Sequence, residues 1–224
     1  SFSTASSVSV DSWVERYNGL DRTSGEAIHR PEKRELVELI ERWGALLPEI
    51  RQKELQEAAV ARMYDLYTGW RRFSGHPDTS APFRTMLAAS TSVSGPKALG
   101  ILQDWREFEG DISLSPTTRD FNQVLLAYAN DDNHIEEAAA VANEVIQHMD
   151  IVYNNYLLPD IETRQLAIRC LARAIQTTDD SSKFVFLEQE MDKLLRMLDR
   201  EVNPNQFLCL VTALSDALES WKFA

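Results

Sequence analysis

The sequence predicts an all-α protein, a right-handed α-solenoid built from stacked antiparallel helix pairs. The first observation is a repeat: five stretches begin with a proline and continue into an amphipathic helical pattern. The intervals between these prolines run from 39 to 46 residues, and the prolines are Pro31, Pro77, Pro116, Pro159 and Pro204. Proline suits this place because its missing N–H falls where a helix has no partner for that donor. The second observation is that eight Gly and eight Pro are too few for a turn-rich β-sandwich.

Residues 1–30 precede the first proline-led stretch, and we expect a partly extended N-terminal leader there. The first ten residues, SFSTASSVSV, are Ser-rich and uncharged. An acid-free, Ser-rich start resembles the end of an organellar targeting segment, or what is left after its removal. A leader without function is the alternative, and the sequence leaves both open.

The first unit, residues 31–76, contains two predicted helices separated by Pro48. The second is expected to bury one face, formed by Ala58, Ala61, Tyr64 and Leu66. Near its end Trp70 stands beside Arg71 and Arg72, which makes this the candidate interaction patch of the N-terminal half. The alternative is a core tryptophan next to a solvated helix end.

The second and third units cover residues 77–115 and 116–158. The second helix of the earlier unit follows Ser94-Gly95-Pro96 and is expected to bury Ala98, Ile101, Leu102, Trp105 and Phe108. In the later unit, apolar residues recur at spacings of three and four, at Ile135, Ala138, Val141, Ala142, Val145 and Met149. Each unit is therefore predicted to be a pair of amphipathic helices.

The fourth unit, residues 159–203, repeats the pattern, and residues 204–224 supply one last helix that would cap the stack. The fourth unit's second helix is expected to bury Phe184, Leu187, Met191, Leu194 and Leu198. Single helix pairs cannot bury their own apolar stripes, so stacking of units 31–224 into one solenoid domain is predicted, with an irregular bundle as the alternative.

No pattern of catalytic or metal-binding residues stands out. His29, His76, His134 and His148 are scattered without the spacing of metal ligands, and there is no phosphate-binding Gly-rich loop or nucleophile elbow. We therefore expect no enzyme activity, no cofactor and no metal. The acidic pairs Asp131-Asp132 and Asp179-Asp180 fall between helices and are interpreted as solvated loops and N-caps.

The two cysteines, Cys170 and Cys209, fall inside apolar helical patterns and are predicted to be buried, reduced thiols without a disulfide. No apolar run approaches the roughly 18 residues of a membrane span. We therefore expect a soluble chain, or one peripheral to a membrane complex.

Charge separates the two halves of the chain. The net charge is −12; residues 1–112 carry 14 Lys/Arg against 17 Asp/Glu, and residues 113–224 carry 9 against 18. The unit 116–158 has one base, Arg119, against seven acids. Such a surface repels phosphate backbones, which argues against nucleic-acid binding.

The unit 116–158 resembles a pentatricopeptide repeat. The resemblance is carried by RDFNQVLLAYA, IEEAAAVANEV and the closing LPD; Phe121-Asn122 stands where that family has Tyr-Asn. Its fold implies an α-solenoid, and its usual function implies binding of single-stranded RNA in an organelle, one base per repeat. Tetratricopeptide repeats are the nearest rival, but their period is shorter. These units are longer than usual and would be expanded or degenerate copies.

By the same resemblance, two positions of each repeat read one base. Carried onto this chain, the pairs are Val37 with Asp78, Phe83 with Thr117, Asn122 with Asp160, and Gln165 with Asn205. Only Asn122 with Asp160 resembles a working, pyrimidine-reading pair, so these two are the candidate RNA contacts.

Two functions follow as hypotheses. The first is a non-catalytic scaffold, a subunit or assembly factor of an organellar ribosome or bioenergetic membrane complex, binding mainly protein. The second is an RNA-binding factor in organellar RNA processing or translation. A mitochondrial location is favoured over a plastid one. A continuous basic groove formed by Arg84, Arg119, Arg164, Arg169 and Arg173 would favour RNA.

Overall fold

A computed structural model describes residues 33–47, 50, 52–74, 79–106, 115–152, 157–201 and 215. Over these residues the chain forms eight α-helices and no strand, which confirms the all-α prediction for this part of the chain. The handedness of a solenoid stays a prediction. The leader 1–30 lies outside the described residues, as does the cap helix 204–224 apart from residue 215.

The chain divides into two compact units, residues 1–89 and 90–224. The described helices of the first unit are α2 (Lys33–Leu46), α3 (Lys53–Ser74) and α4 (Ala81–Ser90). A methyl group added at Gly44 of α2 would lie 2.4 Å from the Thr85 side chain of α4, so these helices approach closely. The rings of Tyr67 in α3 and Phe83 in α4 meet edge to face with centroids 5.0 Å apart.

The buried face of α3 differs from the predicted one. Ala58 is exposed and Tyr64 is only half-buried, although Leu66 is buried as expected. The face that packs is Ala59, Val60, Met63, Leu66 and Tyr67. These residues also recur at spacings of three and four, because the sequence AAVARMYDLY supports two neighbouring stripes and packing selects one of them.

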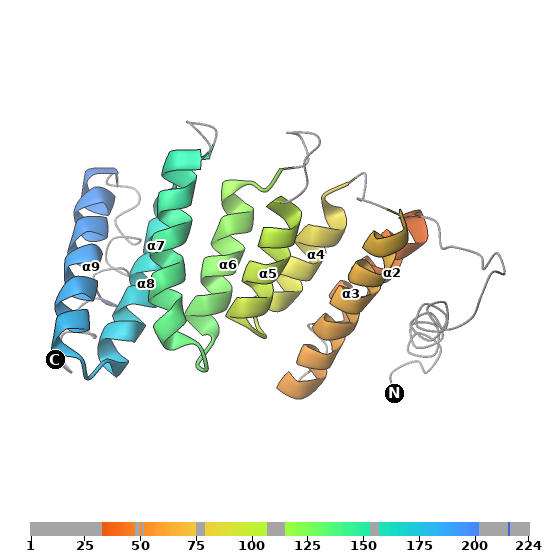
Figure 1. The fold of residues 1–224 in the computed structure, drawn as a ribbon, viewed down its shortest axis with the longest axis horizontal. Coiled ribbons are helices and arrows are strands. Elements are labelled where there is room, and N and C mark those ends of the chain that lie inside the picture. Colours follow the sequence, from red (N-terminus) through yellow and green to blue (C-terminus); the bar gives the residue numbers. More distant parts are fainter. Residues whose placement is uncertain are drawn as a thin grey trace. The chain divides into compact units, whose positions relative to one another are not determined.

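The second unit contains α5 (Gly95–Arg106), α6 (Thr118–Asn130), α7 (Ile135–Val152), α8 (Ile161–Thr177) and α9 (Ser181–Glu201). Each helix packs against the next in sequence, and α6 also packs against α8. Figure 1 shows these helices side by side, with α8 behind α7 and α9. Helices α6 and α8 are the first helices of two successive units, and stacked helix pairs require such a contact.

The second helices bury the faces predicted for them. In α5 the buried side chains include Ala98, Ile101, Leu102 and Trp105; in α7 they include Ala138, Val141, Ala142, Val145 and Met149; in α9 they include Leu187, Met191, Leu194 and Leu198. Ile135 and Phe184 are half-buried, and Phe108 lies outside the described residues. The 3.6-residue period therefore located these three faces correctly.

The prolines mark helix starts with a short offset. Helix α6 begins two residues after Pro116 and α8 two residues after Pro159, while α4 begins four residues after Pro77. At α6 the Asp120 carboxylate accepts hydrogen bonds from the Thr117 N–H at 2.8 Å and from its hydroxyl at 2.7 Å. The carboxylate of the third helical residue thus reaches back to the N-cap residue and gives its N–H a partner, as in a capping box.

Candidate functional site

The structure brings the candidate pair Asn122 and Asp160 together. Asn122 lies in the second turn of α6 and its side chain is buried, with only 1% of the residue exposed. Asp160 is the N-cap residue of α8. The Asn122 amide donates to Asp160 Oδ1 at 3.2 Å, a contact that spans 38 residues and joins two helices.

Thr163 completes this contact. Its hydroxyl lies 2.7 Å from Asn122 Oδ1 and 2.8 Å from Asp160 Oδ1, and its single proton can be donated to only one of them at a time. The Thr163 N–H donates to Asp160 Oδ1 at 2.7 Å, and the Asp160 N–H donates to the Thr163 hydroxyl at 3.1 Å. The amide of α6 is thus built into the capping box of α8. We name Asn122, Asp160 and Thr163 the α6–α8 polar cluster.

The α6–α8 polar cluster keeps Asp160 ionised. Partial burial raises the pKa of Asp160, but the hydrogen bonds from Thr163 and Asn122 and the charge of Arg164 outweigh it, so the pKa lies below its ordinary value. A carboxylate at a helix N-terminus also interacts favourably with the helix dipole. In this geometry the cluster fixes the position of α8 against α6.

A second polar cluster, around Asp131, joins α5, α6 and the start of α7. Asp131 had been expected to be solvated, but it is buried, with 3% of the residue exposed. Its carboxylate accepts from the Gly95 N–H at 2.9 Å and from the Asn133 N–H at 3.0 Å, and lies 2.8 Å from His134 Nδ1. Burial raises the pKa of Asp131, yet these hydrogen bonds and the histidine hold it below the ordinary value.

Tyr128 packs against the first residue of α5 beside this cluster. A methyl group added at Gly95 would lie 2.6 Å from the Tyr128 ring, so only glycine allows this approach. Burial, with the nearby charges of Glu137 and Asp131, raises the pKa of Tyr128 to about 12. The tyrosine therefore stays neutral and serves as packing.

Arg173 of α8 caps the C-terminus of α6. Its guanidinium donates to the carbonyl oxygens of Tyr128 and Ala129 and forms an ion pair with Asp132. A cation suits this place because the last carbonyls of a helix lack partners and carry partial negative charge. Neither the aspartates nor this arginine was recognised from the sequence as a contact between helices.

The arginines that would form a basic groove point in different directions. On α8, Arg164 and Arg173 are nine residues apart, which places them on opposite sides of a helix at 100° per residue. Arg173 is directed to the end of α6, while Arg169 is exposed. Arg119 is exposed on α6, and Arg84 belongs to the other unit. Because Arg164 and Arg173 lie on opposite sides of α8, the complete set of arginines does not line one groove.

The remaining predicted contacts are only partly described. Trp70, Arg71 and Arg72 fall in the last turns of α3, but their side chains lie outside the described part of the structure. Val37 is half-buried and Phe83 is buried, and Gln165 is half-buried in α8. Their counterparts Asp78 and Asn205 are outside the described residues, and Thr117 belongs to a different unit from Phe83.

His148 and Cys170 lie within the packing of the helices, whereas His134 lies in the connection before α7. His148 of α7 lies 3.4 Å from Arg106 through Nδ1 and stacks on Phe121 with ring centroids 6.3 Å apart. Burial and the charge of Arg106 lower the pKa of His148, against a smaller opposing effect of Glu144.

Cys170 is free and buried, its thiol donates to the Leu125 carbonyl at 3.6 Å, and burial raises its pKa to about 12. Cys209 is outside the described residues, so the absence of a disulfide stays a prediction.

Among the residues that the structure describes, no three His, Cys, Asp or Glu side chains are grouped as metal ligands. No helix in the described ranges has the length and apolar character needed to cross a membrane. Comparison with known proteins adds no relative: no family model, curated protein or solved structure matches the chain. The resemblance to pentatricopeptide repeats therefore stays a prediction from the sequence.

Proposed function

We propose that the chain is a non-catalytic helical-repeat scaffold that binds mainly protein, as a subunit or assembly factor of an organellar complex. The ribosome and a bioenergetic membrane complex of a mitochondrion or plastid are the proposed hosts. The observation that supports it most is the state of Asn122, which is buried and bonded to Asp160 and Thr163. To bind a base, the Asn122 amide would first have to break its hydrogen bonds to Asp160 and Thr163. Leaving a buried polar group without hydrogen-bond partners costs free energy.

Charge supports the same proposal. Helix α7 carries four carboxylates and no Lys or Arg, and Arg119 is the only Lys or Arg of the unit 116–158. Binding RNA at physiological salt normally relies on several cations that neutralise phosphates. Basic protein segments are the better electrostatic match, because complementary charge raises the association rate and selects partners.

RNA binding is the second candidate, because the resemblance pairs Asn122 with Asp160 and these two residues are neighbours in the structure; the hydrogen bond that already engages the amide is what places RNA binding second. A native pull-down with and without ribonuclease separates the candidates. We expect the proteins that contact the chain directly to remain bound after ribonuclease treatment. Their release by ribonuclease, together with sub-micromolar RNA affinity at about 150 mM salt, would reject the scaffold proposal.

A further inference from the structure

The side of α6 that carries Phe121 and Tyr128 borders one stripe of α7. The two aromatic residues are seven positions apart, about two helical turns, so they lie on the same side of α6. Phe121 stacks on His148 of α7 with ring centroids 6.3 Å apart. Glu137 and Glu144 precede His148 by eleven and four positions, so all three share one stripe of α7. The two glutamates therefore lie on the side of α7 that borders Tyr128.

The electrostatics of Tyr128 agree with this placement. Burial raises the pKa of Tyr128 to about 12, and the charges of Glu137, Asp131 and Glu144 act in the same direction. Glu137 and Glu144 are exposed, whereas only 2% of Tyr128 is exposed. The hydroxyl is therefore the inner end of a polar site and the two carboxylates are its outer end. We name the Tyr128 hydroxyl, Glu137 and Glu144 the Tyr128 site.

The Tyr128 hydroxyl has no hydrogen-bond partner among the residues that the structure describes. The ring packs against Gly95 of α5, and Arg173 donates to the backbone carbonyl of Tyr128, not to its hydroxyl. Buried polar groups nearly always have a partner, because an unpaired one costs free energy. A neutral phenol oxygen accepts hydrogen bonds, so a ligand with N–H groups can complete the site.

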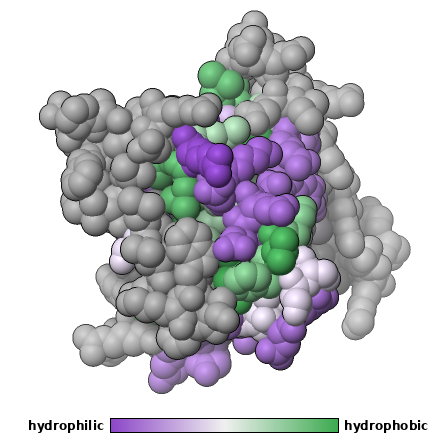
Figure 2. Space-filling model, turned by 90° about the vertical axis from the view of Figure 1, so that its left-hand side faces the viewer, coloured by the Kyte–Doolittle hydropathy of each residue, from purple (hydrophilic) through white to green (hydrophobic). Residues whose placement is uncertain are grey.

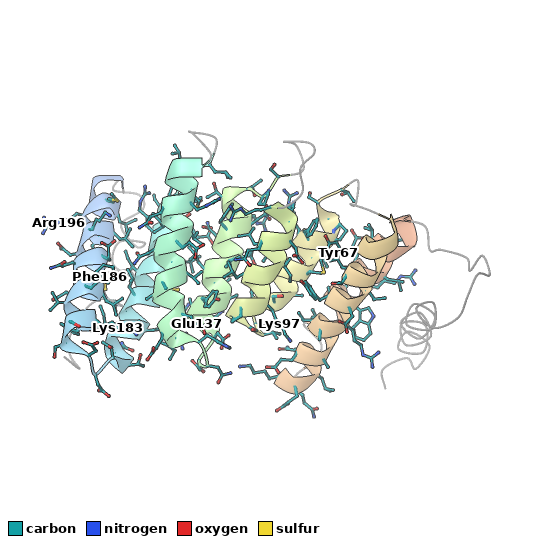
Figure 3. The ribbon with its side chains drawn as sticks, viewed as in Figure 1. Tyr67, Lys97, Glu137, Lys183, Phe186 and Arg196 are labelled. Carbon is teal, nitrogen blue, oxygen red and sulfur yellow. The ribbon has the colours of Figure 1, made fainter. Side chains whose placement is uncertain are left out.

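Glu137 and Glu144 form no ion pair within the described ranges. The acids around them do have basic partners, in the pairs Asp131–His134, Asp132–Arg173 and Glu136–Lys183. On α5, Arg106 is directed to His148, whose lowered pKa keeps it neutral at neutral pH, and Lys97 pairs with neither glutamate. Figure 3 labels Lys97 on α5 and Glu137 on α7. No described side chain therefore forms an ion pair with the carboxylates of the Tyr128 site.

The exposed charges of α9 are arranged differently. Lys193 contacts Glu190 at 3.7 Å and Arg196 contacts Asp192 at 2.7 Å, so charges of opposite sign pair within the helix. Figure 2 views this end of the molecule and shows polar and apolar side chains mixed on its surface. The carboxylates of these pairs already have a cation, unlike those of the Tyr128 site.

We infer that the Tyr128 site binds an arginine side chain of a partner protein. The guanidinium has five N–H donors in a fixed fork, so it can donate to the Tyr128 oxygen and to a carboxylate at once. It is also more weakly hydrated than a lysine ammonium, which lowers the cost of approaching a buried group. The inference rests on the proposed function and names the group by which a basic partner segment is recognised.

The spacing of the glutamates fixes their roles. At 1.5 Å per residue they are about 10 Å apart along α7, more than one guanidinium spans. One carboxylate therefore shares the guanidinium with Tyr128, and the other attracts the cation at longer range. Charge attraction between exposed groups weakens with added salt, whereas the hydrogen bond to the phenol depends much less on salt.

The probe is a short Gly/Ser peptide with one central arginine, isotope-labelled in its side chain. One control peptide has citrulline, which keeps the shape of arginine without its charge, and another has lysine. Free arginine represents a small-molecule source of the same guanidinium. Nuclear magnetic resonance of the labelled arginine measures the affinity for the whole chain. Ring signals of isotope-labelled tyrosine locate the contact, and Tyr128→Phe identifies the signal that belongs to Tyr128.

Three variants test the site: Glu137→Gln with Glu144→Gln, Tyr128→Phe, and Glu162→Gln. Glu162 is the matched control, since it is an exposed carboxylate in the first turn of α8 and forms no ion pair with a described residue. Tyr128→Phe removes only the hydroxyl and keeps the ring that packs against Gly95. Circular dichroism and urea unfolding check that each variant is folded.

We expect the arginine peptide to shift the Tyr128 ring signal and to reach half-saturation below about 10 mM, within the range of weak binding. The double glutamine variant should bind about tenfold or more weakly, because it loses the charge partners. Tyr128→Phe should weaken binding by about two- to tenfold, the effect of one hydrogen bond. Glu162→Gln should bind like the unchanged chain, and the citrulline peptide should leave the Tyr128 signal in place.

No saturation up to about 10 mM, an equal shift with citrulline, equal affinity for lysine, or unchanged affinity in the double glutamine variant would overturn the inference. Tighter binding of free arginine than of the peptide would overturn its assignment to a protein partner. The proposed function is judged separately: proteins retained after ribonuclease treatment support it even where the peptide fails to bind. Their release by ribonuclease rejects the proposed function whatever the peptide does.

Discussion

Replacing Gly95 with alanine should destabilise the second unit, although alanine is the better helix former. The added Cβ would lie 2.6 Å from two ring carbons of Tyr128, about 1 Å inside the usual carbon–carbon contact distance. Tyr128 is buried in α6 and cannot move outward without disturbing α8, whose Arg173 donates to the Tyr128 carbonyl. The hydrogen bond from the Gly95 N–H to Asp131 would be displaced as well.

The expected magnitude comes from two opposing effects. Alanine in place of glycine stabilises a helix by about 0.5–1 kcal/mol, mainly by restricting the unfolded chain. Overpacking of a filled core costs about 1–3 kcal/mol. At Gly95 both act, so we expect a net loss of about 1–2 kcal/mol. At Gly100, also in α5, an added Cβ meets nothing within 4 Å, so only the gain applies.

Urea unfolding followed by circular dichroism measures both variants. Gly100→Ala should be more stable than the unchanged chain and Gly95→Ala less stable, with similar slopes against urea. A second substitution, Tyr128→Leu, should reduce the cost of Gly95→Ala, because the two side chains would no longer collide. A Gly95→Ala variant as stable as Gly100→Ala would show that α5 and Tyr128 are not in this close contact.

Three further predictions concern polar contacts. Thr163→Val should lower the free energy of unfolding by about 1–3 kcal/mol, because it leaves buried Asn122 with one hydrogen-bond partner fewer. Thr163→Ser keeps the hydroxyl and should lower it clearly less in the same urea titration; equal losses would contradict the hydrogen-bond argument. Arg173→Met should lower the free energy of unfolding by about 1–3 kcal/mol, because the carbonyls at the end of α6 lose their donor. Asp132→Ala removes only an exposed ion pair and should change it by at most about 1 kcal/mol. A larger loss for Asp132→Ala than for Arg173→Met would refute the capping role. His148→Gln should flatten the pH dependence of the free energy of unfolding below pH 6.5. The pKa of His148 in the folded chain lies below 6.5, its ordinary value in an unfolded chain. The stability that neutral His148 contributes is therefore complete above pH 6.5 and is lost as the pH falls through the folded pKa. Thermal midpoints between pH 7 and 5, about the range in which histidine titrates, test this, and unchanged slopes would show that His148 is not perturbed.

The sequence located most of the described helices and the buried faces of α5, α7 and α9, because an apolar stripe at 3.6-residue spacing depends only on local order. It misplaced the face of α3, where Ala58 and Ala59 are both small enough to face the core or the solvent. Only packing against the neighbouring helices decides between them.

The polar contacts between helices were mostly beyond sequence reasoning. Asn122 and Asp160 were paired by resemblance, but the burial of Asn122 depends on how closely α8 approaches α6. Asp131 looked like a solvated loop residue because its partner, the Gly95 N–H, is 36 residues away. The spacing of Asp160 and Thr163 is the one signal that was available, since it is that of a capping box.

The α6–α8 polar cluster has a consequence for exchanging repeats between proteins of this architecture. A graft that cuts the chain at the proline-led boundary 158/159 places Asn122 on one fragment and Asp160 and Thr163 on the other. If the foreign repeat that follows lacks the matching carboxylate and hydroxyl, the buried Asn122 amide is left without hydrogen-bond partners. A transferable module that keeps both buried polar clusters therefore runs from the start of α5 to the end of α8, and a junction in the 178–180 connection keeps the Arg173 cap within the same piece.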